Sequence, residues 1–210
     1  MKSISNKPTV HLILIALLGI LSYSNTFNSP FQWDEDFLIA QNPIVKDLSY
    51  FLEPSKAKGF EYYGAFKSRY IGYLTFALNY KLHGTDVRGY HIVNLTIHIL
   101  NALLVYFLVV LTFRTPYLSL RGTESRSNLI ALFSALLFVS HPIQTEAVTY
   151  IFQRLASLCA FFYLLSIVLY IKWRLAFPLP RGEGVRGRVI PLLLYLASIL
   201  SAILAFLQCL

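Results

Sequence analysis

The chain has 210 residues, of which 56% are hydrophobic and only 13% are charged, and its mean hydropathy is +0.58. Soluble domains carry roughly a quarter of charged residues, so this composition excludes an ordinary soluble globular protein and indicates an integral membrane protein. The net charge of +8 comes without a nucleic-acid recognition motif, so we expect no nucleic-acid partner.

Charged residues are missing from five long stretches, at positions 8–33, 89–113, 127–145, 155–171 and 189–210. A helix needs about 20 apolar residues to cross a bilayer. We therefore predict an all-α membrane protein with about five transmembrane helices, at 9–27, 89–113, 128–141, 154–172 and 189–210. Lys2 and Lys7 before the first stretch are also typical of a signal peptide, but Ser22–Ser24 makes a poor cleavage site and favours an uncleaved anchor.

The distribution of Lys and Arg predicts the orientation in the membrane. Ten of the 18 basic residues, but only two of the ten acidic ones, fall before residue 8, between 114 and 127, and between 172 and 188. We expect these segments in the cytoplasm: a cytoplasmic N-terminus at 1–8, a loop at 114–127 and a linker at 173–188. The protein is then a multi-pass protein of the cell membrane, the inner membrane if bacterial, contacting membrane lipids. Segments 28–88 and 142–153 are expected on the non-cytoplasmic side.

The non-cytoplasmic loop 28–88 is long enough to carry structure of its own. Asn42 followed by Pro43 predicts an N-cap and the first turn of a short helix that ends near Phe51. Within segment 70–82, the apolar stretch 71–82 is only twelve residues long and would span about 18 Å as a helix, against a hydrocarbon core of about 30 Å. We expect segment 70–82 to form an interfacial helix on the outer membrane surface.

An acidic cluster, Trp33-Asp34-Glu35-Asp36, follows the first apolar stretch. Carboxylates are costly near hydrocarbon, so acids at the point where a span meets water indicate a functional site. One interpretation is a helix N-terminus, where the helix dipole stabilises negative charge. The other is a general base at the membrane surface. The two are compatible, because a capping aspartate stays ionised and can accept a proton.

The second predicted span carries a polar stripe. His91, Asn94, His98 and Asn101 are separated by steps of three, four and three, which places them on one helix face. Such a face has to contact other helices or a wet cavity rather than lipid. Two histidines seven residues apart lie about 10 Å from each other along a helix axis, so we expect no shared metal. No cofactor is expected either.

Polar residues also cluster before the fourth predicted span. A shared helix face would carry Glu146, Tyr150, Gln153 and Ser157, with Arg154 on its flank. We assign His141 and Glu146 to the same polar bundle face as the stripe. The planar fork of Arg154 suits a substrate phosphate, and the alternative is an arginine that reaches out to lipid phosphate. The two cysteines, Cys159 and Cys209, have no metal-ligand spacing, and we expect neither a zinc site nor a disulfide.

The order of these motifs resembles the membrane part of the protein O-mannosyltransferases that carry tetratricopeptide repeats. These belong to the GT-C class of polyprenyl-phosphate-sugar glycosyltransferases. The likeness runs from about residue 10 to about 204, and five motifs in order make it specific. Its elements are Phe-Gln-Trp-Asp-Glu at 31–35, Asn-Pro-Ile-Val-Lys-Asp-Leu at 42–48, Arg69 with the following 74–80, the segment 89–101, and His-Pro-Ile-Gln-Thr-Glu-Ala-Val at 141–148 running on to Arg154.

The resemblance implies a multi-pass enzyme whose large outer loop carries the acidic catalytic motif, which maps onto Asp34 and Glu35. Asp34 would take the proton from an acceptor hydroxyl, on a protein or a lipid. The hydroxyl oxygen would displace polyprenyl phosphate from the sugar, mannose in this family, with inversion. Arg69 and Arg154 are the candidates for binding the donor phosphate, and the scheme requires no metal.

The chain ends at Leu210, before the further spans and repeats of that family. We therefore expect an N-terminal portion of such an enzyme, in which truncation can abolish activity. The missing spans or the repeat domain would then be a partner on a separate chain. The competing hypothesis is a non-enzymatic membrane protein, such as a transporter subunit or assembly partner, that uses the stripe on 91–101 to bind another helix.

Overall fold

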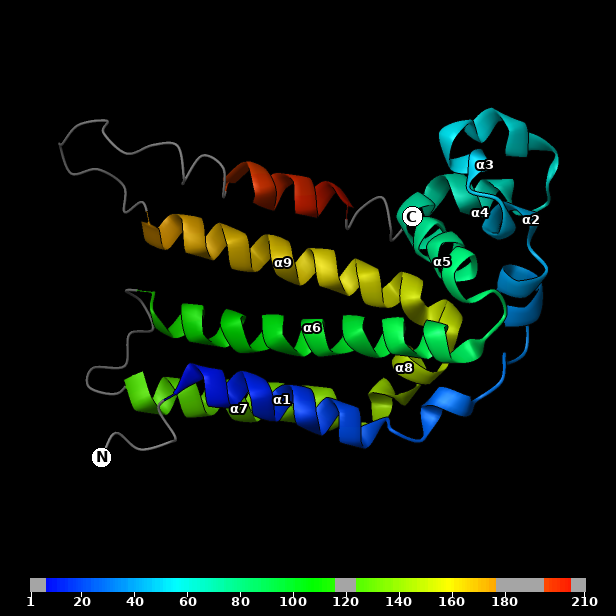
Figure 1. The fold of residues 1–210 in the computed structure, drawn as a ribbon. Helices are drawn as coiled ribbons and strands as arrows, with labels where there is room; N and C mark the ends of the chain where they lie inside the picture. Colours follow the sequence, from blue (N-terminus) through cyan, green and yellow to red (C-terminus); the bar gives the residue numbers. More distant parts are fainter. Residues whose placement is uncertain (1–6, 116–123, 177–194, 205–210) are drawn as a thin grey trace.

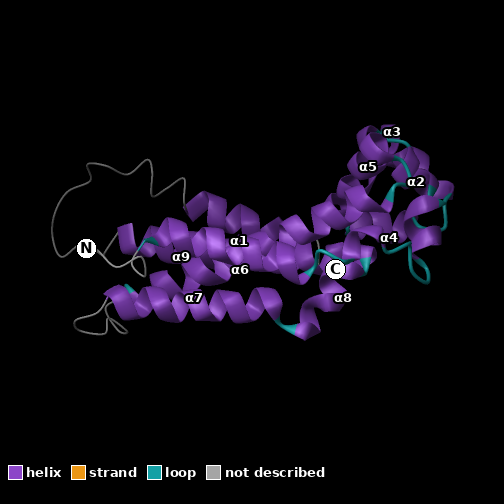
Figure 2. Ribbon diagram, turned by 60° about the horizontal axis from the view of Figure 1, so that its bottom comes forward, coloured by secondary structure: helices purple, strands orange, loops and turns teal. Residues whose placement is uncertain are grey.

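The computed structural model describes residues 7–115, 124–176 and 195–204. Within these ranges every regular element is a helix, as predicted (Figures 1 and 2). Four long helices run side by side: α1 (Pro8–Ser22), α6 (Val87–Phe113), α7 (Glu124–Ser140) and α9 (Arg154–Ala176). A further apolar helix, Tyr195–Leu204, lies along α9. There Tyr195 packs on Trp173, and Ser201 donates a hydrogen bond of 2.8 Å to the carbonyl of Phe162.

Helix α6 is the centre of the bundle, since α7 and α9 pack along it and α1 packs against both α7 and α6. Small residues allow these helices to approach closely. Ala102, Ala131 and Ala135 are buried at the contact. At Gly19 of α1, a Cβ atom would lie 2.9 Å from Ile99 Cγ1 and 3.0 Å from Val139 Cγ2, so no larger side chain fits there without movement.

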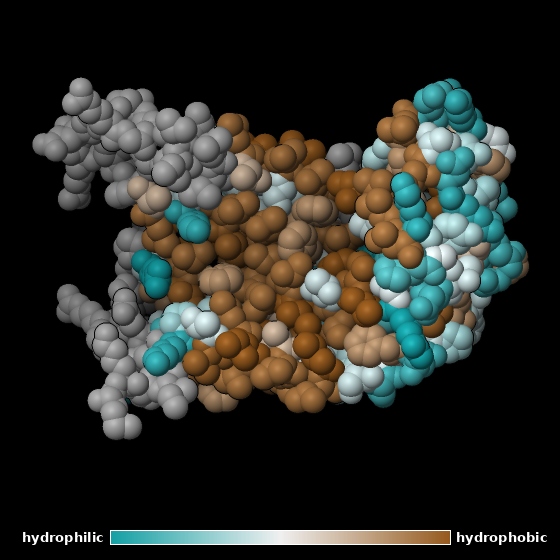
Figure 3. Space-filling model, in the orientation of Figure 1, coloured by the Kyte–Doolittle hydropathy of each residue, from teal (hydrophilic) through white to brown (hydrophobic). Residues whose placement is uncertain are grey.

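The apolar surface of the long helices supports a membrane location. Figure 3 shows a hydrophobic belt over the bundle and a hydrophilic region over the end that carries α2–α5. Two helices are long and apolar enough to cross a bilayer, Val87–Phe113 and Ile151–Ala176. The pair Arg126–Ser140 and Pro142–Thr149, bent by 50°, would make a third. Pro8–Ser22 and Tyr195–Leu204 are shorter apolar helices. The membrane character is thus confirmed, while five spans and their orientation stay a prediction.

Residues between α1 and α6 form a compact helical cap at one end of the bundle (Figure 1). Its helices are α2 (Pro43–Lys46), α3 (Ser49–Leu52), α4 (Tyr63–Ser68) and α5 (Tyr70–His83), with a 3-10 turn at Pro54–Gly59. Its core is rich in aromatic rings packed edge to face, as in Phe51 on Phe66. The same end of the bundle holds the end of α1, the start of α6 and the start of α9. Three chain segments therefore meet beside the cap.

The predicted helix at 42–51 is divided into two single turns. Asn42 caps α2 as expected, accepting a hydrogen bond from the Ile44 amide at 3.0 Å. Asp47 then adopts an extended conformation, and its carboxylate accepts a bond of 2.8 Å from the Ser49 amide, which restarts the chain as α3. An aspartate that competes for local amides in this way ends one helix and begins another.

One cysteine differs from expectation. Cys159 in α9 is disulfide-bonded. The other cysteine of the sequence, Cys209, lies outside the described residues. Sequence spacing gave no indication of this bond, because a disulfide depends on the distance between two Cα atoms in space and not on their separation along the chain.

Candidate active site

The acidic cluster forms a tight turn beside the cap. Trp33 has a φ of 52°, in the left-handed region that bulky residues rarely adopt. The Glu35 amide donates to the Gln32 carbonyl at 3.0 Å and closes the turn, and a π-helical turn follows at Asp36–Ala40. Unusual backbone of both kinds gathers at functional sites. The turn leaves Trp33 91% exposed and separates the environments of Asp34 and Glu35.

Glu35 is completely buried and ties the acidic turn to the chain just before α9. Its Oε2 accepts a bond of 2.8 Å from the Gln32 amide, and its Oε1 accepts one of 2.9 Å from the Phe152 amide. Burial raises the pKa of Glu35, and the charge of Asp34 raises it further, while the backbone amides of Gln32, Phe152 and Ile151 oppose the shift. Both carboxylate oxygens are thus engaged, which suits Glu35 to holding the turn in place.

Asp34 is the exposed carboxylate of the pair. Its Oδ1 accepts a hydrogen bond from the phenol of Tyr150, which lies 116 residues away in the sequence. Burial raises the pKa of Tyr150, and the bond to Asp34 and its charge add to the shift. The phenol therefore stays protonated and can donate at physiological pH. Because it bonds to Oδ1 of Asp34, the other oxygen, Oδ2, remains for another partner.

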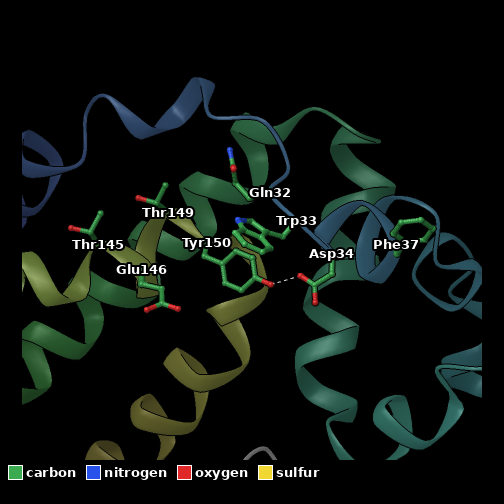
Figure 4. A pocket seen from close by; sticks show the side chains of 8 residues that line it. All are labelled: Gln32, Trp33, Asp34, Phe37, Thr145, Glu146, Thr149 and Tyr150. Atoms are coloured by element: carbon green, nitrogen blue, oxygen red, sulfur yellow. Dashed lines mark hydrogen bonds between the residues drawn. The ribbon is translucent and has the colours of Figure 1, made fainter.

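A pocket of about 810 Å³ opens beside this pair (Figure 4). This volume is within the range of small-molecule sites, roughly 300–1,000 Å³. The acidic turn forms one wall, and α8 (Thr145–Thr149) forms the other. The buried Thr149 Oγ1 has no partner among the described residues. The lining residues are Gln32, Trp33, Asp34, Phe37, Thr145, Glu146, Thr149 and Tyr150.

The polar stripe of α6 is buried and faces other parts of the same chain. His91 Nε2 donates to the carbonyl of Ser29 at 2.9 Å, and His98 Nε2 donates to that of Val139 at 3.1 Å. Asn101 donates to the carbonyl of Ser157 at 3.0 Å. The accepting carbonyls belong to the loop after α1, to the end of α7 and to the first turn of α9. Polar side chains of α6 therefore join it to three other segments of the chain.

Two residues assigned to that face lie elsewhere. His141 is exposed at the bend after α7, where its Nδ1 accepts a bond of 3.2 Å from the Ile143 amide. Glu146 is exposed and lines the pocket. The chain leaves α8 at Tyr150 in an extended conformation and makes a 3-10 turn at Ile151–Gln153 before α9 begins. Glu146, Tyr150 and Gln153 therefore do not share one helix face, because the helix is interrupted between them.

Neither predicted phosphate-binding arginine lines the pocket. Arg69 is partly exposed between α4 and α5. Arg154 is completely buried, with its guanidinium bonded to residues of α5 and α6. It thus neither reaches out toward lipid nor faces the pocket. Phosphate binding by either residue stays a prediction.

Comparison with known proteins finds several relatives of the chain, all of them named as protein O-mannosyl-transferases. No family model and no solved structure matches it. It is 33% identical over 169 residues to Protein O-mannosyl-transferase F38B6.6 of Caenorhabditis elegans and 33% identical over 165 residues to Protein O-mannosyl-transferase tmtc2 of Xenopus laevis. It is 29% identical over 170 residues to Protein O-mannosyl-transferase TMTC4 of Homo sapiens. The chain is a homologue of the protein O-mannosyl-transferases.

The match covers most of this chain but a small part of each O-mannosyl-transferase. It covers 78%, 76% and 76% of the chain, and 23%, 18% and 22% of those three relatives. The chain therefore spans about a fifth of the length of the curated relatives it matches. The predicted resemblance to the membrane part of that family is confirmed.

In this O-mannosyl-transferase homologue, the sequence located the acidic motif but not its partners. Tyr150 and the Phe152 amide contact the acids across more than a hundred residues, and no local pattern signals such a contact. Thr145 and Thr149 were missed as well. Their spacing of four, on the same helix turn as Glu146, was the one available sign that α8 presents polar groups to a common pocket.

The raised pKa of Glu35 predicts a pH dependence of stability. A carboxyl whose folded-state pKa lies above its unfolded value of 4.5 stabilises the fold at acidic pH and loses this contribution as pH rises through the folded-state pKa. We expect the thermal midpoint of the parent to fall, relative to Glu35→Gln, as pH rises above 4.5. Thermal unfolding in detergent micelles checks this. Glu61→Gln, at an exposed position, is the control, and parallel curves for the parent and Glu35→Gln would contradict the expectation.

Proposed function

We propose that the chain is the N-terminal portion of an integral-membrane glycosyltransferase that moves a sugar from a polyprenyl-phosphate donor to an acceptor hydroxyl. The names of the relatives indicate mannose as the sugar and a protein as the acceptor. The observation that carries the proposal is the exposed carboxylate of Asp34, oriented by Tyr150 at the wall of a pocket at one end of an apolar helical bundle.

In the proposed reaction Asp34 is the general base. Its Oδ2 takes the proton of the acceptor hydroxyl while the hydroxyl oxygen forms a bond to the anomeric carbon. The bond from that carbon to the phosphate oxygen breaks with inversion, and polyprenyl phosphate leaves with the electron pair. Glu35 holds the turn rather than transferring the proton, because both of its oxygens already accept amide hydrogen bonds.

The surroundings of the pocket suit a donor that is carried by the membrane. The exposed rings of Trp33 and Phe37, at 91% and 58%, line the pocket, and aromatic side chains are enriched where protein meets the lipid headgroups. A phosphate that leaves here needs a cation to stabilise its developing charge. We propose Arg69 for this role, since Arg154 would first have to give up its buried contacts.

The stripe of α6 gives little support to the competing hypothesis of a non-enzymatic partner-binding protein. All four stripe residues bond to other segments of the same chain, so these groups are not available to a second protein. The names of the relatives favour an enzyme as well.

The location of the acidic turn tests the proposal directly. We expect alkaline phosphatase fused within residues 54–59 to be active, because this mostly exposed segment belongs to the same loop as the acidic turn, which we propose to lie on the non-cytoplasmic face with the lipid-borne donor. A fluorescent reporter that folds only in the cytoplasm should be bright when fused within 116–123. The opposite pattern would place Asp34 in the cytosol, and the transfer mechanism would then be wrong.

A further inference from the structure

Arg154 is the largest completely buried side chain of the described protein, and it has an unusual environment. Its Nε donates to Asn94 Oδ1 at 2.7 Å, one terminal nitrogen donates to Asn79 Oδ1 at 2.8 Å, and the other donates to the carbonyl of Tyr90 at 3.0 Å. The guanidinium carbon also lies 4.6 Å from the centre of the Phe76 ring. Among the described side chains, no carboxylate comes within ion-pairing distance of it.

A buried cation without a carboxylate partner is costly, and neutral side chains could join the same helices at a smaller cost. The neutral dipoles that surround Arg154 come from α5 and α6, and one of them belongs to a residue that also contacts the segment between α8 and α9. That residue is Asn94. Because its amide oxygen is taken by Arg154, its amide nitrogen has to point the other way.

The nitrogen of Asn94 points at the interruption between α8 and α9. It lies 3.2 Å from the carbonyl oxygen of Ile151 and 3.4 Å from those of Val148 and Tyr150. In a regular helix each of these three carbonyls would accept from the backbone amide four residues later, so they could not all point at one side-chain donor. Asn94 thus stabilises the irregular backbone of 148–151.

The same irregular backbone carries both contacts to the acidic turn. Tyr150 donates its phenol to Asp34, and the Phe152 amide donates to Glu35. We propose that Arg154 is a positioning residue that acts through Asn94: it orients the Asn94 amide, which fixes residues 148–152 and thereby the Asp34 carboxylate. We call this chain of contacts the relay. Its effect on catalysis rests on the proposed function, but its effect on the conformation of the acidic turn does not.

A spectroscopic test needs no sugar transfer. The sequence has two tryptophans, so Trp173→Phe leaves Trp33, next to Asp34 in the pocket, as the single site for 5-fluorotryptophan. We expect Asn94→Leu, Arg154→Lys and Tyr150→Phe each to move or split the fluorine-19 resonance of Trp33 by more than its linewidth. Lysine keeps the charge but lacks the fork that orients Asn94.

The matched control is Asn101→Leu. Asn101 lies on the same stripe and is also buried, but its amide donates to the carbonyl of Ser157 in the first turn of α9 and to none of the carbonyls of residues 148–151. We expect it to leave the Trp33 resonance unchanged. Asn94→Leu and Arg154→Lys act on the same relay. The variant that combines them should therefore show no larger shift of the Trp33 resonance than Asn94→Leu alone. If Asn94→Leu does not fold, the conservative Arg154→Lys decides the outcome.

An unmoved resonance in Arg154→Lys, an additive shift in the double variant, or an equal shift in Asn101→Leu would overturn the proposal. Kinetics add a second readout where transfer is measurable. A positioning role predicts that Arg154→Lys lowers kcat by about 10- to 100-fold and leaves the donor KM unchanged. A raised donor KM at constant kcat would instead identify Arg154 as a phosphate ligand. Failure of the parent to transfer sugar would count against the proposed function alone.

Discussion

Asp34→Asn is expected to lower sugar transfer by about 10²- to 10⁴-fold, the range that a positioned general base contributes. Asparagine keeps the shape of the side chain and can still accept the Tyr150 hydrogen bond, but it cannot take a proton from the acceptor. The pocket and the fold should therefore persist. Transfer of radiolabelled sugar from polyprenyl-phosphate mannose, in membranes that contain the chain, measures the effect.

The matched control for this experiment is Asp36→Asn. Asp36 belongs to the same acidic cluster and is exposed, but its carboxylate bonds to Gln41, which follows the π-helical turn, and Asp36 does not line the pocket. We expect it to retain transfer close to that of the parent. Equal loss in both variants would show that the cluster contributes only its charge, and retained transfer in Asp34→Asn would rule out Asp34 as the base.

Tyr150→Phe is expected to lower kcat by about 10- to 100-fold. A hydrogen bond to a charged group contributes about 1.5–3 kcal/mol, and each 1.4 kcal/mol corresponds to about a factor of ten in rate. Phenylalanine removes only the hydroxyl that holds Oδ1 of Asp34. The same transfer assay, run over donor concentration, should show a fall in kcat with little change in KM.

Tyr80→Phe provides the comparison for the Tyr150 variant. Tyr80 is a partly buried tyrosine of α5 that does not line the pocket. Its phenol is expected to be dispensable for transfer. If Tyr150→Phe transfers sugar as fast as Tyr80→Phe, the bond from the phenol to the Asp34 carboxylate does not contribute to the rate of transfer.

Composition and periodicity predicted the parts of the fold that depend on nearest neighbours along the chain. Helix α5 at Tyr70–His83 was expected at 70–82, and α6 at Val87–Phe113 was expected at 89–113. Both follow from apolar length and from turn residues at their ends. The spacing of three and four on α6 likewise predicted a polar face that avoids lipid, since that face depends only on the helical period.

The interruption at Tyr150 could not be predicted in the same way. No proline or glycine marks it, and residues 145–153 have the spacing of a continuous helix. It persists because Asn94, more than fifty residues earlier, satisfies the carbonyls that a helix would have used. Arg154 was misplaced for a related reason: its position near a predicted membrane surface suggested exposure, whereas α5 and α6 enclose it.

The bond between Glu35 and the Phe152 amide, which spans 117 residues, has a consequence for biogenesis. A ribosome delivers α1 and the acidic turn long before it delivers residue 152. During this interval the Glu35 carboxylate lacks half of its partners and Asp34 lacks its phenol. The contacts that fix the acidic turn are therefore completed late, when the segment just before α9 has been synthesised, and a shorter nascent chain carries the acidic motif without them.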